Sequence, residues 1–286
     1  SIMTGSTFFH GPPVLALGLT KLFKKSKKVD ETNIKITNSW LTVNNWLIDH
    51  VLPNTEWDIT IDEDLDLNLQ GRYLMTCNHQ SWVDTTVNQY FGLTRMPLTR
   101  FFTKWELIFI PFVGQALKIL GFPMMKRHSK EQIAKNPELK YRDMEEARKS
   151  CEQLLSQPFT LLNYLEGTRF TPEKHAQQQS PYQNLLKPKA GGLALALNIL
   201  GDQVDALVDM TIVYPNGAPG YGEFWLGEVP RIAVDLRKIE IPTWVHGGNY
   251  EDDAEFREKF QHWVDELWTE KDQLITRMKA KNSVTE

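Results

Sequence analysis

Residues 75–84 read MTCNHQSWVD and carry the strongest signal of the fold. An apolar run leads into it and gives way to polar residues at Asn78, which indicates a buried strand that leaves the core there. The residues that follow predict a helix, with Ser81 as a candidate N-cap. This stretch therefore predicts a strand, a polar turn and a helix, which is the repeating pattern of α/β proteins.

His79 and Asp84 are five positions apart in this turn, just over one helical turn. If His79 lies before the helix, the Asp84 carboxylate can fold back onto its ring. Such a pair fixes the tautomer of the imidazole and makes it a usable general base. The alternative is that Asp84 only stabilises the start of a helix and that His79 is an ordinary turn residue. One H-x-x-x-x-D pattern does not decide between them.

Length and composition bound the class of protein. The 286 residues suit one large α/β domain or two small ones, and 41% hydrophobic residues supply a sizeable core. The formal net charge of −4 argues against a nucleic-acid partner. The two cysteines, Cys77 and Cys151, form neither a disulfide framework nor a metal-ligand pattern, which predicts a reduced, cytosolic setting. We see no internal repeat or clear linker, so we expect one main domain, residues 54–286.

Residues 1–53 predict a short helical segment that associates with a membrane surface. Residues 8–23 are largely apolar, and five lysines lie between positions 21 and 28, a combination that suits an anionic lipid surface. A solvated N-terminal arm is the alternative interpretation. No stretch of the chain reaches the roughly 20 uninterrupted apolar residues of a transmembrane helix.

Hydrophobic periodicity predicts a mixed, mostly parallel sheet flanked by helices. Strands are expected at residues 57–61, 72–77, 100–103, 122–125, 159–165, 204–213, 223–226 and 232–239. The longer helices are expected at residues 38–52, 138–155, 193–200 and 252–279. Residues 171–186 are polar and predict a long loop.

Residues that carry chemistry fall at the expected ends of strands. His79 and residues 166–169 (EGTR) follow two strands, and Lys104 follows a third. In α/β sheets, ligands bind beyond the carboxyl ends of the strands. We therefore expect a base, a carboxylate and cations that suit a phosphate to converge there.

Each of these residues also has a structural interpretation. Arg169 and Glu166 can form an ion pair that only supports the loop. Lys104 can be a surface charge, and Lys187 and Lys189 can belong to a solvated loop. These alternatives stay open when each residue is taken singly.

Four blocks in order make the chain resemble the glycerolipid acyltransferases of the 1-acylglycerol-3-phosphate acyltransferase family. They are residues 78–84 (NHQSWVD), residues 104–114 (KWELIFIPFVG) with 121–127 (GFPMMKR), residues 166–169 (EGTR) and residues 212–215 (IVYP). Two features depart from the usual pattern. Phe170 stands where a small Ser is frequent, and residues 186–192 (LKPKAGG) are more similar to the branch that contains lysocardiolipin-type acyltransferases.

The resemblance implies a glycerolipid acyltransferase fold and a reaction. A fatty acyl group would move from acyl-CoA or acyl-carrier protein to the free hydroxyl of a lysophospholipid, with 1-acylglycerol-3-phosphate as the expected acceptor. His79, oriented by Asp84, would remove the hydroxyl proton. A backbone N–H near Gly167 would stabilise the oxyanion. No metal and no cofactor is implied.

The resemblance also implies an acceptor site and a location. Arg169 and Lys104 would hold the phosphate, with Arg127 as a weaker candidate. Glu166 and Thr168 would line the glycerol. The enzyme would associate with a membrane at its cytoplasmic face.

Three other readings compete with acyl transfer. A thioesterase would use water in place of the lysophospholipid. In a variant of the mechanism, Cys77 is the nucleophile and His79 its base. A non-catalytic lipid-binding module would use the N-terminal region alone, and it would leave His79, Asp84 and Glu166 without a role.

Overall fold

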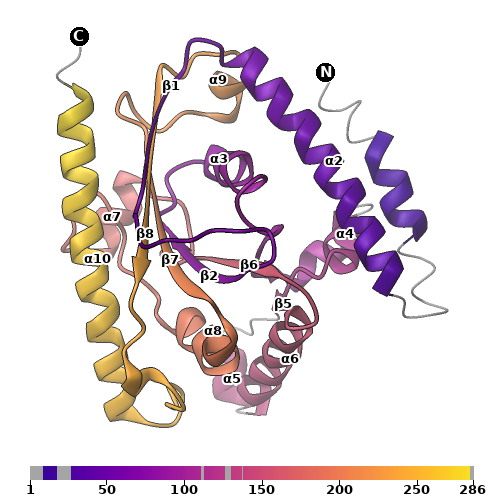
Figure 1. Cartoon of the computed structure of the whole chain (residues 1–286). Coiled ribbons are helices and arrows are strands. Elements are labelled where there is room, and N and C mark those ends of the chain that lie inside the picture. The colour runs from indigo at the N-terminus through magenta and orange to yellow at the C-terminus, as the bar shows by residue number, and fades with distance from the viewer. Residues whose placement is uncertain (1–8, 18–26, 111–112, 126–129, 137, 284–286) are drawn as a thin grey trace.

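The computed structural model places a six-stranded sheet at the centre of the chain, with the order β1-β8-β7-β2-β6-β3 (Figure 1). The structure describes residues 9–17, 27–110, 113–125, 130–136 and 138–283. The strands of this sheet are β1 (Glu56–Ile61), β2 (Arg72–Cys77), β3 (Thr99–Phe101), β6 (Phe159–Tyr164), β7 (Ala206–Val213) and β8 (Arg231–Ile239). A second, two-stranded sheet consists of β4 (Thr103–Lys104) and β5 (Met124–Met125).

The sheet is mixed and mostly parallel, as the sequence predicts. Strands β7, β2, β6 and β3 run in one direction. Strand β8 runs antiparallel to β7, and β1 runs parallel to β8. The carboxyl ends of β2, β6 and β7 therefore lie at one edge of the sheet, and the segments that follow these three strands meet there.

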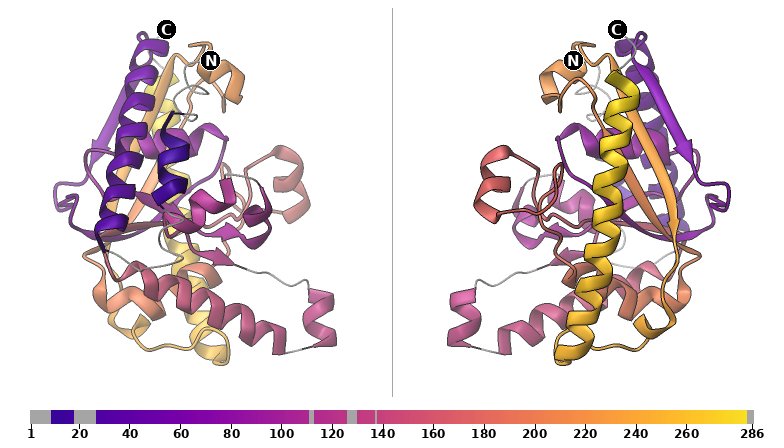
Figure 2. Two further views of the ribbon diagram at one scale, coloured as in Figure 1. Left: turned by 90° about the vertical axis from the view of Figure 1, so that its right-hand side faces the viewer. Right: turned by 90° about the vertical axis from the view of Figure 1, so that its left-hand side faces the viewer.

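Helices cover both faces of the sheet. One face packs against α2 (Lys27–Val51), α3 (Val83–Gly92) and α9 (Tyr221–Trp225). The other packs against α6 (Glu138–Leu154), α8 (Gly191–Leu200) and α10 (Ala254–Ser283), and α10 runs along the length of the molecule (Figure 2). The shorter helices are α4 (Val113–Ile119), α5 (Lys130–Lys135), α7 (Pro172–Gln178) and the 3-10 turns Trp105–Phe109, Gly201–Gln203 and Thr243–Val245.

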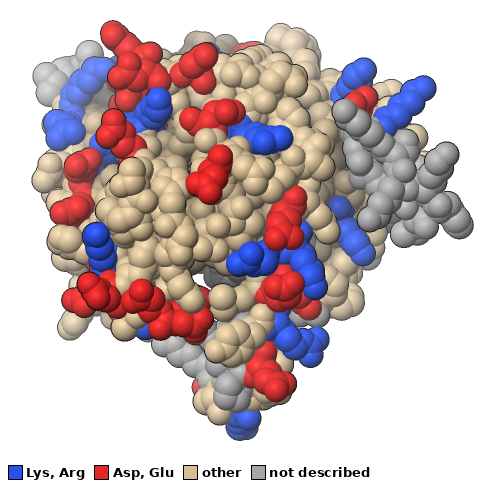
Figure 3. All heavy atoms as spheres, turned by 60° about the horizontal axis from the view of Figure 1, so that its bottom comes forward, with Lys and Arg blue, Asp and Glu red and all other residues tan. Residues whose placement is uncertain are grey.

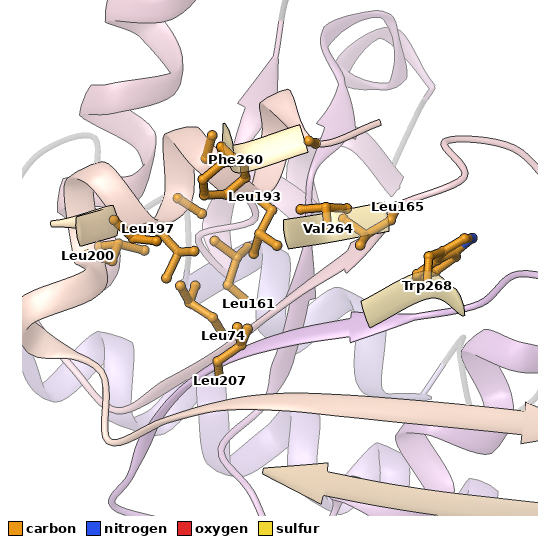
Figure 4. Packing of buried hydrophobic residues seen from close by; sticks show 14 of the residues in the cluster. Leu74, Leu161, Leu165, Leu193, Leu197, Leu200, Leu207, Phe260, Val264 and Trp268 are labelled. Carbon is orange, nitrogen blue, oxygen red and sulfur yellow. The ribbon is translucent and has the colours of Figure 1, made fainter. Parts of the chain in front are cut away.

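Both faces of the central strands are buried, which explains their nearly continuous apolar sequences. In β2, Leu74 faces the α8 and α10 side, whereas Tyr73 and Met75 face the α2 and α3 side. Figure 4 shows Leu74 among the side chains that join the sheet to α8 and α10, with Leu193 nearby. Each fully buried side chain of this size contributes about 1.5–3 kcal/mol to stability.

Helix α6 is amphipathic, with apolar residues on one side and charged residues on the other, as the sequence predicts. Ala147, Cys151 and Leu154 are buried against the sheet side of the helix. On the solvent side, Glu145 and Lys149 form an ion pair one turn apart, 3.4 Å between charged atoms. The face of the molecule in Figure 3 shows the same mixture, because acidic and basic side chains are interspersed across it.

The N-terminal region consists of a helix at residues 9–17 and of α2. Helix α2 packs on the main body, and its Ile48 belongs to the core on the α3 side together with Leu52, which follows the helix. Among the described helices, none has a stretch both long and apolar enough to cross a bilayer. Most of the lysine cluster falls outside the described residues, so the membrane-associating role and the boundary after residue 53 stay predictions.

Two local predictions were wrong. Residues 223–226 were expected to form a strand, but residues 221–225 are the short helix α9. Glu223 reaches back and accepts a hydrogen bond from the Gly220 N–H, which caps this helix. Residues 171–186 were expected to be a loop, but they contain α7, which starts at a Thr171 cap followed by Pro172.

Candidate active site

Three segments that follow parallel strands build the site. The turn after β2 carries His79, the turn after β6 carries residues 165–169, and Tyr214 directly follows β7. The side chain of Asn78 ties the first of these to the third. Its amide N–H donates to the Ile212 carbonyl oxygen over 2.8 Å, and its oxygen accepts from the Ile212 N–H over 2.9 Å. This buried pair fixes the start of the His79 turn against β7.

His79 and Asp84 form the pair that their spacing predicts. The distance from His79 Nδ1 to Asp84 Oδ2 is 2.8 Å. Asp84 is fully buried, whereas the His79 side chain keeps 14% of its surface exposed. Because an ionised carboxylate only accepts hydrogen bonds, the proton of the neutral ring lies on Nδ1. The Nε2 atom is then left as the basic nitrogen.

The Asp84 carboxylate is itself held by three further donors. Its Oδ2 accepts from the backbone N–H groups of Gln80 (2.6 Å) and Ser81 (2.9 Å). Its Oδ1 accepts from the hydroxyl of Tyr214 over 2.8 Å. Burial, followed by the charge of Asp84, raises the pKa of Tyr214 well above its usual value, so Tyr214 stays a donor. These contacts fix the orientation of Asp84 before any substrate binds.

Tyr164 limits the motion of the His79 ring from one side. The two rings are stacked, with centroids 4.2 Å apart and planes 19° from parallel. Together with the bond to Asp84, this stack restricts rotation of the imidazole. The ring is therefore preorganised in one orientation.

Glu166 is buried and links two backbone segments through its carboxylate. Its Oε1 accepts from the His79 N–H over 2.7 Å, and its Oε2 accepts from the Leu186 N–H over 2.9 Å. Burial raises the pKa of Glu166 to about 7, against the lowering effect of these two bonds. The family resemblance implies that Glu166 lines the acceptor glycerol. Its position below the His79 turn instead engages both oxygens with backbone groups.

Position 167 requires glycine because of its backbone conformation and because the Lys189 side chain lies close to it. Its φ angle is +65°, in the left-handed region that side chains disfavour. A Cβ at this position would also lie 3.0 Å from the Lys189 Nζ atom and 3.2 Å from its Cδ atom. The Gly167 N–H donates to the Tyr164 carbonyl oxygen over 2.9 Å. That donor is occupied within the turn, whereas the resemblance implies a backbone N–H near Gly167 for the oxyanion.

The cationic part of the site lies on the same turn. The guanidinium of Arg169 lies 4.4 Å from the centroid of the Trp82 ring, a cation–π contact with an exposed tryptophan. Lys174 donates to the Thr168 hydroxyl over 2.7 Å and to the Arg169 carbonyl oxygen over 3.0 Å. The described contacts of Arg169 thus point to Trp82 rather than to the Glu166 ion pair that sequence left open.

Two predicted cations have no described side chain. Lys104 ends β4, in the small second sheet, and its side chain is outside the described part of the chain. Arg127 lies outside the described residues altogether. Their predicted role at the phosphate stays a prediction.

Cys77 does not have the properties of a nucleophile. Its thiol is fully buried, and burial raises its pKa well above the usual value. A cysteine nucleophile acts as the thiolate. This environment argues against the variant in which Cys77 attacks the substrate.

Several side chains of the site were not predicted from the sequence, among them Tyr164 against the His79 ring, Trp82 against Arg169, Tyr214 and Lys174. Tyr214 stands inside the fourth block (residues 212–215), so its position was visible but its partner, Asp84, was not. Lys174 carried no signal, because it stands in a stretch expected to be a loop.

Comparisons with known proteins agree on the class of this chain. The family model described as Acyltransferase matches residues 58–215, more than half of the 286 residues. The chain is 24% identical over 265 residues to the 2-acyl-1-lysophosphatidylinositol acyltransferase of Saccharomyces cerevisiae, a match that covers 76% of this chain and 64% of that protein. It is 23% identical over 226 residues to lysocardiolipin acyltransferase 1 of Gallus gallus, with 72% and 53% covered.

The fold is similar to that of a solved enzyme. The structure matches the crystal structure of the 1-acyl-sn-glycerophosphate acyltransferase PlsC from Thermotoga maritima with a TM-score of 0.50, over 96% of this chain and 95% of that chain. The two sequences are 16% identical over this match, so the likeness concerns the fold. The chain spans between about half and two thirds of the length of the two curated relatives. From the family match and the four ordered blocks, the chain belongs to the acyltransferase family, among the glycerolipid acyltransferases.

Proposed function

We propose that this protein is a lysophospholipid acyltransferase that uses His79 as its general base. The acyl donor is a thioester of coenzyme A or of acyl-carrier protein. The acceptor is the free hydroxyl of a lysophospholipid, with 1-acylglycerol-3-phosphate as the first candidate and phosphatidic acid as its product.

The observation that carries the proposal is the fixed His79 ring. Asp84 accepts the Nδ1 proton, and Tyr164 stacks on one face of the ring, so Nε2 remains for the substrate. A neutral imidazole with a free Nε2 is the usual general base for a hydroxyl group. The partial exposure of this side chain leaves it accessible, while Asp84 stays out of solvent.

The proposed reaction conserves atoms and charge. Nε2 of His79 takes the proton of the acceptor hydroxyl as its oxygen attacks the thioester carbonyl carbon. The tetrahedral intermediate collapses, the carbon–sulfur bond breaks and the ester forms. The imidazolium returns its proton to the departing thiolate, which leaves as a free thiol. Asp84 stabilises the imidazolium between these two steps.

The proposed acceptor site lies on the turn after β6. Arg169 supplies a planar, permanently charged group for the phosphate, and its stack on Trp82 holds it in place. Thr168 accepts from Lys174 and keeps its own hydroxyl proton for the acceptor. Lys104 and Arg127 remain candidates for the same phosphate. Glu166 has both oxygens engaged, so we assign it to support of the site.

The choice of acceptor rests on a shared chemical group. The names of the relatives refer to lysophosphatidylinositol, lysocardiolipin and 1-acyl-sn-glycerophosphate. All of these contain a glycerol hydroxyl beside a phosphate, which suits a base next to a guanidinium. Another lysophospholipid is therefore the alternative acceptor.

We also propose that the protein acts on a membrane surface, at the cytoplasmic face, with residues 1–53 in contact with lipid. Phe9 and Trp46 of this region are 75% and 52% exposed. Aromatic side chains of this kind favour the interface between lipid and water. Flotation with anionic and with neutral vesicles tests the contact. Equal recovery with both vesicle types would count against a role for the lysines.

A panel of acceptors tests the function. The purified protein is incubated with one labelled acyl-CoA or acyl-carrier protein and a series of lysophospholipids that differ in headgroup. We expect label in the phospholipid product and the highest kcat/KM with 1-acylglycerol-3-phosphate. Release of labelled fatty acid independent of acceptor would identify a thioesterase instead.

A further inference from the structure

Helix α10 lies outside residues 58–215, the part of the chain that the family model matches. It nevertheless packs in the core beside β6 and β7. Its Val264 lies beside Leu165, the residue that precedes Glu166, and Trp268 belongs to the same buried cluster (Figure 4). The helix thus reaches the segment that carries the site.

The same helix holds residues 182–186 through a series of hydrogen bonds. The Asp272 carboxylate accepts the N–H of Gln183 over 2.8 Å on one oxygen and the N–H of Asn184 over 2.7 Å on the other. The side chain of Asn184 then donates to the Thr276 hydroxyl over 2.9 Å and accepts from Lys279 over 2.7 Å. These contacts come from successive turns of α10, so they fix the segment along the helix axis.

Leu186 joins this segment to the catalytic turn. Its carbonyl oxygen accepts from the indole N–H of Trp268 over 2.9 Å, and its own N–H donates to Glu166. The other oxygen of Glu166 accepts the His79 N–H. Leu186, Glu166 and Trp268 are all at most 1% exposed. Water therefore does not replace these bonds when one of them is lost.

A second contact ties α10 to the sheet below the site. Lys271 is fully buried and lies 2.9 Å from the Asp209 carboxylate on β7, and it also donates to the Met210 carbonyl oxygen over 2.7 Å. Although burial acts to raise it, the charges of Lys271 and Arg237 hold the pKa of Asp209 below its usual value. A buried ion pair of this kind fixes the rotation of the helix that carries it.

We propose that α10 is a positioning element of the active site, in which Asp272 and Trp268 hold residues 183–186 so that Leu186 and Glu166 set the place of His79. This inference rests on the proposed function for its kinetic consequence, but the brace itself is a property of the fold. Asp272 and Trp268 act through Leu186 and Glu166, without touching substrate. Misplacement of the base by a fraction of an ångström lowers turnover, whereas the acceptor site on Arg169 stays intact.

The experiment compares Asp272→Ala with Gln273→Ala in the full chain. Gln273 is the next residue on α10 and is exposed, so its variant controls for changes to the helix. Asp272→Asn keeps one carbonyl oxygen as an acceptor and is expected to fall between wild type and Asp272→Ala. Trp268→Phe removes only the indole N–H and part of the ring. Circular dichroism confirms that each variant is folded.

Two measurements are made on each variant. Hydrogen exchange reports the protection of the amides of residues 183–187 and of 79–82. Steady-state kinetics with acyl-CoA and 1-acylglycerol-3-phosphate report kcat and the acceptor KM. For Asp272→Ala we expect about tenfold faster exchange in both segments, about tenfold lower kcat and an acceptor KM within about twofold of wild type.

Several outcomes would overturn the proposal. Unchanged exchange at residues 79–82 in both Asp272→Ala and Trp268→Phe would show that the brace does not reach His79. A raised acceptor KM with unchanged kcat would place the segment in binding rather than in positioning. If wild type transferred no acyl group, the proposed function would fail, and the exchange measurement would still decide whether α10 positions His79.

Discussion

The turn after β2 and the turn after β6 meet at the same place but are built differently. In the first, His79 and its carboxylate partner Asp84 lie five residues apart, and the N–H groups of Gln80 and Ser81 hold that carboxylate within the same turn. Tyr214 adds a donor to Asp84 from 130 residues along the chain. In the second, Glu166 is held in place through partners 87 and 20 residues away, one of which is tied to α10 a further 82 residues along the chain.

This difference distinguishes the residues that would react or bind charge from the contacts that hold them in position. The groups that would react or bind charge, His79 and Arg169, stand in short motifs because a base and its carboxylate need only one turn of chain. The placement of these side chains depends on backbone N–H and carbonyl groups of distant segments. Every residue type except proline carries both groups, so they leave no motif in the sequence. We therefore expect loss of the base to lower turnover most and loss of Arg169 to raise mainly the acceptor KM. Loss of a supporting contact should lower turnover by a smaller factor.

The largest expected effect comes from removal of the base. His79→Ala should lower kcat by about 10²–10⁴-fold, the usual contribution of a general base, with little change in acceptor binding. His246→Ala is the matched control, since His246 also pairs with a carboxylate, Asp202, at 2.6 Å but is 40% exposed. Steady-state kinetics of both variants check this. Comparable activity of the two variants would contradict the assignment of the base.

Removal of the guanidinium should have the next largest effect. Arg169→Ala should lower kcat/KM for the acceptor by about 30-fold, which corresponds to about 2 kcal/mol for a hydrogen bond to a charged group. The change should appear mainly in the acceptor KM. Lys187→Ala removes an exposed charge from the neighbouring segment and should leave both constants near wild type. The phosphate assignment fails if Arg169→Ala behaves like Lys187→Ala.

Loss of one support for the carboxylate should have a smaller effect. Tyr214→Phe removes the hydroxyl that donates to Asp84. Loss of this hydrogen bond to a charged group should cost about 1.5 kcal/mol and so lower kcat about tenfold. The acceptor KM should stay within about twofold. Tyr221→Phe is the control, because Tyr221 is 44% exposed on α9. Equal kinetics of the two variants would mean that the Tyr214 hydroxyl does not contribute to the positioning of Asp84.

The last prediction concerns the stability of the fold and its pH dependence, with the smallest expected effect on turnover. The pKa of Glu166 is raised from 4.5 to about 7, so the folded protein binds this proton more tightly than the unfolded chain. The contribution of Glu166 to the free energy of unfolding should therefore fall as pH rises from about 4.5 to about 7, by at most about 1.4 kcal/mol per pH unit. Glu166→Gln should lack this contribution.

Urea unfolding of wild type and Glu166→Gln between pH 4.5 and pH 8 measures the difference. The gap between their free energies of unfolding should change with pH in the stated direction. A gap that is constant across this range would show that Glu166 titrates at its ordinary pKa.

Much of the fold was predictable because its core strands are apolar on both faces. The strands at residues 72–77 and 159–164 and the helix that ends the chain all appear close to their expected places. The errors came from short elements. A helix of five residues, α9, depends on one cap by Glu223, and α7 begins at Thr171 and Pro172, a pattern that was readable as a helix start.

The candidate site was predictable to a similar extent. The pairing of His79 with Asp84 is confirmed as geometry, since both lie in one turn. The contacts of Glu166 could not be predicted. The sequence of the motif does not indicate whether this carboxylate faces the substrate or accepts two backbone N–H groups. Glu166 is fully buried and accepts the Leu186 N–H, which belongs to a segment 20 residues further along the chain.

By itself, the sequence determined which chemical groups are present at the ends of β2 and β6, and that a histidine and an aspartate lie within reach of each other. Short-range geometry suffices for this, because one turn of backbone limits where two side chains can go. The long-range contacts appear only in the folded chain: Glu166 accepts the His79 N–H, Tyr214 donates to Asp84, and α10 bonds to Leu186, the other partner of Glu166. Those contacts join residues far apart in the chain, and they form only when the whole sheet and its helices have packed.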